Sequence, residues 1–141
     1  MKKDNGVYVL DTSALFTYIE DESGADHVEQ LLLDAEKGDA VIYISFISLT
    51  EVFYITSREN DESKAMERIN LIKSLAVSIQ ESDENLNLEA ARIKSKNSIS
   101  LADSYIAALC RYHKGILVHK DPEFEKISSL IREQRLPYKN S

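Results

Sequence analysis

The sequence predicts an α/β fold, a three-layer αβα sandwich with a central parallel sheet. Two short apolar segments, 7–10 and 41–46, are typical of strands that helices cover on both faces. Longer amphipathic segments lie between such runs, and strands that alternate with helices favour a parallel sheet. With 141 residues, 43% of them hydrophobic, the chain can build one core, so we expect a single domain over residues 1–141.

The first half of the chain is expected to form two strands and four helices. Strand 7–10 leads into a helix over 12–19, with Thr12 or Ser13 as its N-cap, and apolar residues at helical spacing predict a second helix over 23–37. After strand 41–46, Ser48-Leu49-Thr50-Glu51 has the pattern of a capping box that opens a third helix. The charged segment 57–64 separates this helix from a fourth around 65–75, which predicts a helical hairpin.

The second half continues the alternation. A short β-prone segment, 76–79, is the third expected strand, followed by helices over 83–96 and 104–113. The box-like pattern 100–103 precedes the second of these, and Gly115 ends it. Strand 116–118 comes next, then Asp121 as the cap of a helix that begins at Pro122. We expect a terminal helix over 126–135 and a frayed end at 139–141.

Composition narrows the class of protein. The formal charge of -7, from 24 acidic and 17 basic residues, argues against a protein that coats nucleic acid non-specifically, but carboxylates that hold cations can still bind phosphate. The single cysteine, Cys110, lies in an apolar helical pattern and is expected to be a buried thiol in a reducing compartment. No segment reaches the roughly 20 apolar residues that span a bilayer, and residues 1–5 do not open a signal peptide. We therefore expect a cytoplasmic protein without membrane contact.

Four acidic residues stand at predicted strand ends or helix starts: Asp11, Glu51, Asp103 and Asp121. Each alone has a structural explanation, since helix caps and first turns favour acids. Asp11, Glu51 and Asp121, however, follow strands whose carboxyl ends should meet at one edge of the sheet, where ligands bind. Carboxylates that converge repel one another unless cations bind them, and oxygen ligands suit Mg²⁺ or Mn²⁺. The pattern therefore predicts metal-assisted hydrolysis of phosphodiester bonds.

The chain resembles the PIN-domain ribonucleases, and its size resembles the VapC-type toxins of toxin-antitoxin pairs. Four segments that carry the resemblance occur in the family's order: 9–15, 50–52, 101–108 and 118–124. The resemblance implies that Asp11, Glu51, Asp103 and Asp121 bind Mg²⁺ or Mn²⁺ for RNA cleavage, with Ser13 hydrogen bonded to the first acid and Thr12 beside it. It also implies a homodimer, and an antitoxin peptide laid across the site near the 51–64 hairpin.

One position departs from the family pattern. The family often has Ser or Thr two residues before its last acid, and this chain has His119, which could contact substrate phosphate or pack inside the protein. Basic residues beside the acidic blocks offer a route for RNA, although most surface Lys and Arg need no such explanation. The candidates for substrate binding are Lys94, Lys96 and Lys120, and Arg92, Arg111 and Lys114 lie near them.

Three other functions remain open. A PIN-fold module could bind proteins through its helical hairpin without nuclease activity, although the presence of all four acids argues against it. An RNA-processing nuclease could work without an antitoxin. A phosphotransfer domain with Asp11 as covalent acceptor is disfavoured, because the second acid that common aspartyl phosphatases carry two residues later is Ser13 here.

Overall fold

Five parallel strands form the centre of the protein, in the order β3-β2-β1-β4-β5. The computed structural model describes residues 6–139, so the expectations for residues 1–5 and for the frayed end at 140–141 lie outside it. The strands are β1 Val7–Leu10, β2 Val41–Ser45, β3 Ser78–Gln80, β4 Ile116–His119 and β5 Arg132–Arg135. The predicted parallel sheet is confirmed, with one strand more than the sequence indicated.

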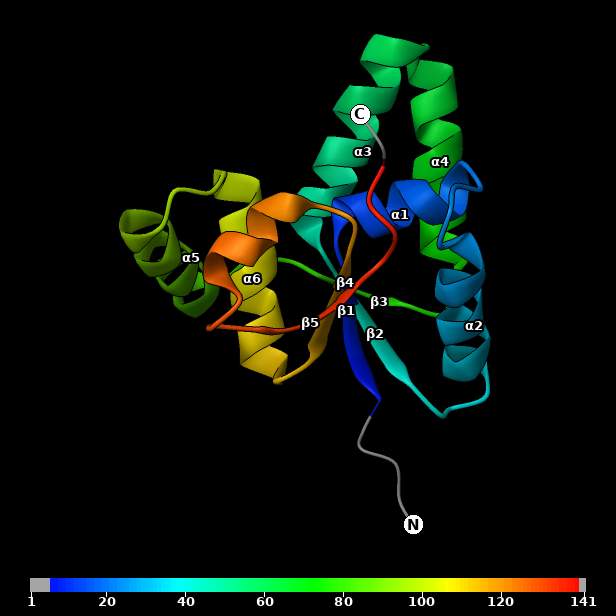
Figure 1. Ribbon diagram of the computed structural model, residues 1–141. Helices are drawn as coiled ribbons and strands as arrows, with labels where there is room; N and C mark the ends of the chain where they lie inside the picture. Colours follow the sequence, from blue (N-terminus) through cyan, green and yellow to red (C-terminus); the bar gives the residue numbers. More distant parts are fainter. Residues whose placement is uncertain (1–5, 140–141) are drawn as a thin grey trace.

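Helices cover both faces of this sheet and complete the predicted αβα sandwich (Figure 1). Helices α1 to α4 pack on one face and helices α5 and α6 on the other, together with the 3-10 helix η1. Their bounds are α1 Thr12–Ile19, α2 Ala25–Glu36, α3 Phe46–Glu59, α4 Glu62–Ser74, α5 Glu84–Lys96, α6 Leu101–His113 and η1 Pro122–Ile127. Helices α3 and α4 form the predicted hairpin, which projects beyond the sheet.

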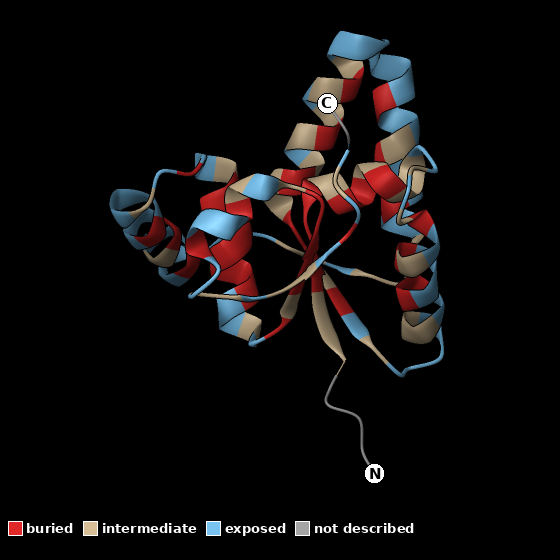
Figure 2. Ribbon diagram, in the orientation of Figure 1, coloured by how far each residue is buried: buried red, intermediate tan, exposed pale blue. Residues whose placement is uncertain are grey.

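The two central strands divide their side chains between two cores. Val9 of β1 and Leu117 of β4 pack under α5 and α6, while Leu10 and Val118 pack under α1 to α4. Figure 2 shows this buried centre and the exposed tip of the hairpin. Because the chain crosses from one side of the sheet to the other between β1 and β4, their carboxyl ends form the switch point where ligands bind in such folds.

Helix α3 begins earlier than the predicted capping box. Its N-cap is Ser45, whose side chain accepts a hydrogen bond from the Ile47 N–H, so Ser48 is buried inside the first turn and caps nothing. The apolar residues 46 and 47 hid this start, because they extend the run of the preceding strand. Likewise, the charged segment 57–64 breaks the helix only at Asn60 and Asp61. Glu51 therefore lies in the second turn of α3.

The terminal helix predicted over 126–135 is wrong. The chain forms η1, which Asp121 caps and Pro122 opens as expected, and then the edge strand β5. Residues 132–135 are all polar and favour helices locally, but their backbone pairs with β4 from Ile116 to His119. Charged side chains are typical of edge strands, and the alternation that reveals a buried strand is missing here.

Smaller features follow the sequence closely. Helix α1 has the predicted bounds, although its N-cap is Asp11 and neither Thr12 nor Ser13. Ser100 caps α6 by accepting from the Asp103 N–H, and the α6 C-cap, Lys114, has a φ of 52° just before Gly115. The Cys110 thiol is buried and donates to the Gly115 carbonyl, as expected for a structural cysteine. Within residues 6–139, no helix combines the length and apolar character needed to cross a bilayer.

Candidate functional site

Asp11 lies at the end of β1, where this strand meets β4. Its backbone N–H donates to the Val118 carbonyl at 3.2 Å, so the backbone pairing of β1 with β4 continues to Asp11. The side chain is buried and caps α1, with Oδ1 accepting from the Ala14 N–H at 2.8 Å. The Ser13 hydroxyl lies 2.8 Å from both carboxylate oxygens and accepts from the Lys120 N–H at 2.7 Å. Ser13 thus joins Asp11 to the tip of β4.

Glu51 reaches the same edge from α3. The Thr12 hydroxyl donates to Glu51 Oε1 at 2.6 Å and lies 3.0 Å from the hydroxyl of the buried Ser48. Thr12 therefore fixes the orientation of Glu51 relative to the first turn of α1. The contact between Thr12 and Ser48 could not be predicted from the sequence, because the pattern 48–51 indicated that Ser48 caps a helix.

Asp103 occupies the first turn of α6 and is 7% exposed. Its pKa is raised, first by burial and then by the negative charges of Asp121, Asp11 and Glu51. The protonated Asp103 carboxyl also hydrogen bonds to Asp121, which raises its pKa further. These mutual effects show that the four predicted acids gather at one edge of the sheet.

Asp121 is held through its backbone by His119. Its N–H donates to His119 Nδ1 at 3.0 Å, and its carboxylate accepts from the Glu123 N–H at 2.9 Å. Because Nδ1 accepts, the ring proton is on Nε2, which donates to Glu133 Oε1 at 2.8 Å. His119 is fully buried with both ring nitrogens engaged, so of the two open roles the structure shows packing. Glu133 was missed, because the sequence placed it on a helix.

Asp11 and Asp103 are buried, Glu51 and Asp121 are partly buried, and none of the four has a neutralising partner within residues 6–139. Burial is the main cause that raises the pKa of Asp11 to about 7, and the charge of Asp121 adds to it. Over residues 6–139, neither Lys nor Arg forms an ion pair with any of the four carboxylates. In the same range, no three Asp, Glu, His or Cys side chains stand close enough to hold one metal ion as they are. The carboxylates are near neighbours, but they do not form a preassembled ligand cage.

The basic candidates differ in how accessible they are. The Lys120 side chain is 4% exposed, with Nζ 3.5 Å from Glu22 Oε1, which leaves it little access to a large ligand. Lys94 is exposed and donates to the Ile99 carbonyl at 2.6 Å, in the loop that leads to Asp103. Lys96 is exposed in the last turn of α5.

A cavity of about 360 Å³ adjoins the acids. It reaches from Ser13 and Lys120 to Ile55 and Glu59 of α3, so it lies between the switch point and the hairpin. The remaining lining residues come from α1, the loop that follows it, the start of η1 and the C-terminal segment: Phe16, Glu20, Glu22, Pro122, Tyr138 and Lys139.

Comparisons with known proteins agree with this fold. The structure of VapBC2 from Rickettsia felis bound to a promoter DNA fragment has a TM-score of 0.75 and 18% identity, covering 93% of this chain and 99% of that one. A toxin-antitoxin complex from Klebsiella pneumoniae has a TM-score of 0.60 and 18% identity, with 85% and 92% covered. The structure of the sarcin-ricin loop cleaving toxin VapC20 of Mycobacterium tuberculosis has a TM-score of 0.66 and 16% identity, covering 84% of this chain and 92% of that one.

Sequence comparisons place the chain in a family. No curated protein matches it. The family model for the PIN domain matches residues 8–130, a range that contains all four acids and, except for Val7, every element from β1 to η1. The chain therefore belongs to the PIN domain family.

Proposed function

We propose that this protein is an endoribonuclease dependent on Mg²⁺ or Mn²⁺ and the toxin of a toxin-antitoxin pair. The observation that carries the proposal is the gathering of four carboxylates at the switch point, two of them buried, without ion pairs to Lys or Arg in residues 6–139. Ionised carboxylates in this arrangement repel one another, and a divalent cation removes that cost. A purely structural role in capping does not require such a cluster.

The donor set fits a hard cation. All four side chains offer oxygen, and Mg²⁺ takes only one or two carboxylates while keeping several waters, so it does not need the preassembled cage that residues 6–139 lack. Asp11 and Asp121 would hold the ion, with Asp103 and Glu51 completing or orienting its shell. Such an ion supplies an activated water and stabilises the leaving oxygen in phosphodiester hydrolysis.

The remaining contacts position these acids. Ser13 restrains both oxygens of Asp11, and Thr12 restrains Glu51. The buried His119 ring holds the Asp121 backbone. Asp121 lies close enough to Asp103 to raise the pKa of the Asp103 carboxyl, so a cation that binds these acids would favour their ionised forms.

Replacement of Asp11 tests the proposal. Asp11→Asn keeps the size of the side chain and removes its charge, so we expect RNA cleavage with Mg²⁺ or Mn²⁺ to fall at least 100-fold, on the order of the loss of an electrostatic contribution to catalysis. Asp39→Asn, on the exposed loop before β2, is the matched control and should cleave like the wild type. Undiminished cleavage by a folded Asp11→Asn protein would contradict the assignment.

The cavity beside Ser13 suits the predicted antitoxin segment. Its walls combine the apolar side chains Phe16, Ile55 and Tyr138 with acids and lysines that are largely paired, since Glu22 contacts both Lys120 and Lys139 and Glu20 pairs with Arg68. This lining favours a peptide that inserts apolar residues. To test this site, the antitoxin is co-expressed with the wild type and with Ile55→Glu. Weaker inhibition of RNA cleavage in Ile55→Glu than in the wild type would support the site. Equal inhibition of both proteins would place the antitoxin elsewhere.

Two further proposals concern assembly and the non-catalytic alternative. The family resemblance implies a homodimer, which light scattering at micromolar concentration tests directly, and a monomer there would contradict it. A binding module without nuclease activity would show neither Mn²⁺ binding by calorimetry nor stabilisation of folding by Mn²⁺. An RNA-processing nuclease would cleave RNA and have no antitoxin that inhibits it.

A further inference from the structure

Negative charge is unevenly distributed between the two sides of the sheet. Residues 12–75, which form α1 to α4 and β2, carry 13 acidic and five basic residues, a net charge of -8. Residues 76–141 carry nine acidic and 10 basic residues, a net charge of +1, even though they include Asp103 and Asp121. Two of these cations, Lys120 and Lys139, line the cavity beside α1 and α3, but the side built from α5, α6, η1 and β5 is still the less negative side and the easier one for a polyanion to approach.

Five cations on this side line three adjoining hollows of about 330, 310 and 240 Å³. Arg111 lines all three, and Leu130 and Arg92 each line two, so the hollows form one continuous surface. We call its exposed cations the α5–α6 basic strip: Arg92, Lys96, Arg111, Lys114 and Arg132.

The strip retains most of its charge. Glu89 is the one acid that lines these hollows, with carboxylate oxygens 3.1 Å from Arg111 Nε and 3.6 Å from Arg92 Nη1. Arg111 Nη1 donates to the Leu130 carbonyl at 2.7 Å, and Arg132 Nη2 donates to the Lys114 carbonyl at 3.0 Å. These hydrogen bonds orient the guanidinium groups without neutralising them. Four positive charges remain in excess along the strip.

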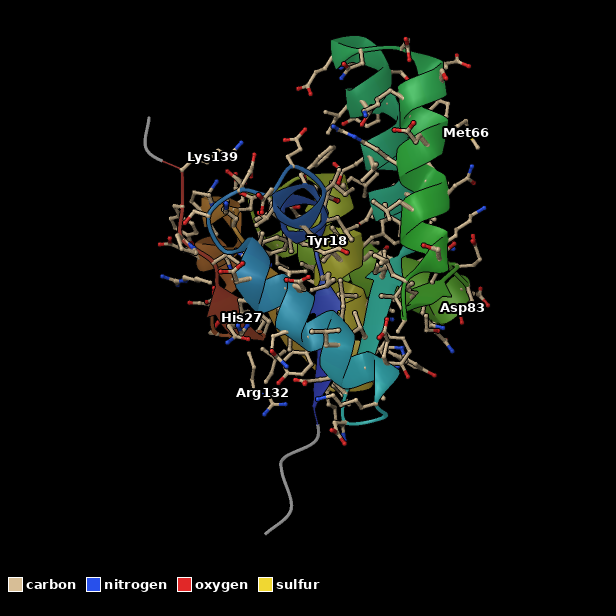
Figure 3. The ribbon with its side chains drawn as sticks, turned by 90° about the vertical axis from the view of Figure 1, so that its right-hand side faces the viewer. Tyr18, His27, Met66, Asp83, Arg132 and Lys139 are labelled. Atoms are coloured by element: carbon tan, nitrogen blue, oxygen red, sulfur yellow. The ribbon has the colours of Figure 1, made fainter. Side chains whose placement is uncertain are left out.

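The strip runs from the far edge of the sheet towards the acids. Arg132 opens β5 and Lys114 precedes β4, so both lie at the amino ends of the strands, and Figure 3 shows Arg132 far from Lys139 at the other end of the C-terminal segment. Helices α5 and α6 pack side by side and antiparallel, so Lys96 at the end of α5 lies near the start of α6. There Lys126 Nζ of η1 donates to the Ser98 carbonyl at 3.0 Å and pairs with Glu123 at 3.2 Å, so this lysine joins η1 to the loop before α6 without adding net charge to the strip.

An exposed aromatic ring lies within this surface. Tyr112 is 71% exposed and lines one hollow together with Arg92 and Arg111. Aromatic faces among cations are typical of surfaces that bind single strands, because bases stack on the ring while the cations follow the phosphates. A site for simple anions would not need the ring.

We propose that the α5–α6 basic strip binds single-stranded RNA and holds one arm of the substrate while the four acids act on the scissile bond. This inference rests on the proposed ribonuclease function and adds the surface that contacts the substrate. Charge complementarity selects the occupant, and Tyr112 favours RNA with unpaired bases over a duplex, whose bases cannot stack on a side chain.

Binding to a single-stranded RNA of about 12 nucleotides tests the strip. All proteins carry Asp11→Asn so that the RNA stays intact, and the strip variant adds Arg92→Gln, Lys96→Gln and Lys114→Gln. We expect affinity at low salt to fall at least tenfold, and the slope of log affinity against log salt to decrease by about 2, since each phosphate contact on a single strand contributes about 0.7. The matched control, Lys37→Gln with Lys64→Gln and Lys73→Gln, changes the same charge on the other face and should bind as the parent does. Parental affinity and slope in the strip variant, or an equal loss in the control, would overturn the proposal.

Tyr112→Ala separates RNA recognition from general attraction to polyanions. We expect affinity for the single-stranded RNA to fall about fivefold or more, and affinity for heparin to stay unchanged. An equal loss for both ligands, or no loss for RNA, would contradict stacking on Tyr112.

The two proposals fail in different ways. If the wild type cleaves no RNA but the strip variant loses RNA binding, the nuclease assignment is wrong and the strip stands. If the wild type cleaves RNA and the strip variant binds like its parent, the nuclease assignment stands and the strip is wrong.

Discussion

His119 shows how one side chain can connect an edge strand to an acid of the candidate site. Its ring receives the Asp121 N–H on Nδ1 and donates to Glu133 on Nε2, so it links β4, the start of η1 and β5. A Ser or Thr, which the related family often has at this position, can accept from the Asp121 N–H but is too short to reach Glu133. The larger residue thus ties the edge strand to the site.

Replacement of His119 should be costly for the fold. His119→Ala leaves a cavity and an unpaired Asp121 N–H, and it leaves Glu133 with Arg135 as its remaining partner, so we expect the free energy of unfolding to fall by roughly 2–4 kcal/mol. Urea denaturation measures this loss. The half-buried His27 on α2 offers a control, since His27→Ala should cost less than about 1 kcal/mol. Equal losses for the two variants would contradict a special role for His119.

At the residue scale, the sequence indicated the four acids better than the residues that hydrogen bond to them or hold them in place. Asp11, Glu51, Asp103 and Asp121 could be proposed from where they stand relative to strands and helices, and the structure gathers them. Their catalytic roles stay a prediction. The contacts of Ser48 and Glu133 could not be predicted, because each depends on where a distant element docks.

At the scale of elements, Thr12 links α1 to α3 through Glu51. Thr12→Val removes the hydroxyl and keeps the shape, so we expect Mg²⁺ affinity or cleavage to fall by about 10-fold, as for other residues that orient ligands. Cleavage assays across Mg²⁺ concentrations measure this effect. Thr17→Val, in the same helix, removes a hydroxyl that bonds only to the Ser13 carbonyl four residues earlier and should have a smaller effect. If the two variants behave alike, Thr12 does not orient Glu51.

Elements with strong hydrophobic patterns were predictable, and those defined by pairing were not. The bounds of α1 and the presence of the α3–α4 hairpin follow from local patterns. β5 does not, because Arg132-Glu133-Gln134-Arg135 has the composition of a helix and becomes a strand only by pairing with β4. The start of α3 was hidden for the opposite reason, since Phe46 and Ile47 extend an apolar strand.

At the scale of the whole molecule, the buried acids link folding to pH. Because the pKa of Asp11 and that of Asp103 are raised, the folded protein holds protons that the unfolded chain releases. This contribution to stability is complete below about pH 4 and is lost as the pH rises through about 7 for Asp11 and about 8 for Asp103. The lowered pKa of His113 acts in the opposite direction below pH 6.5. The lowered pKa values of Glu22 and Glu133 matter only below about pH 4.5.

Urea denaturation in EDTA should therefore show stability falling between about pH 6 and pH 8, by up to about 1.4 kcal/mol per pH unit for each carboxyl group. Excess Mn²⁺ at about pH 8 should restore it, since a cation that binds the ionised acids stabilises the folded state by about 2.7 kcal/mol at 100 times its Kd. Asp11→Asn should flatten the pH profile and reduce the effect of Mn²⁺, because one of the two titrating groups and one expected ligand are lost together. Asp39→Asn should reproduce the wild-type profile. Stability in EDTA that stays level or rises over this range would show that burial and mutual repulsion do not raise the pKa of these acids.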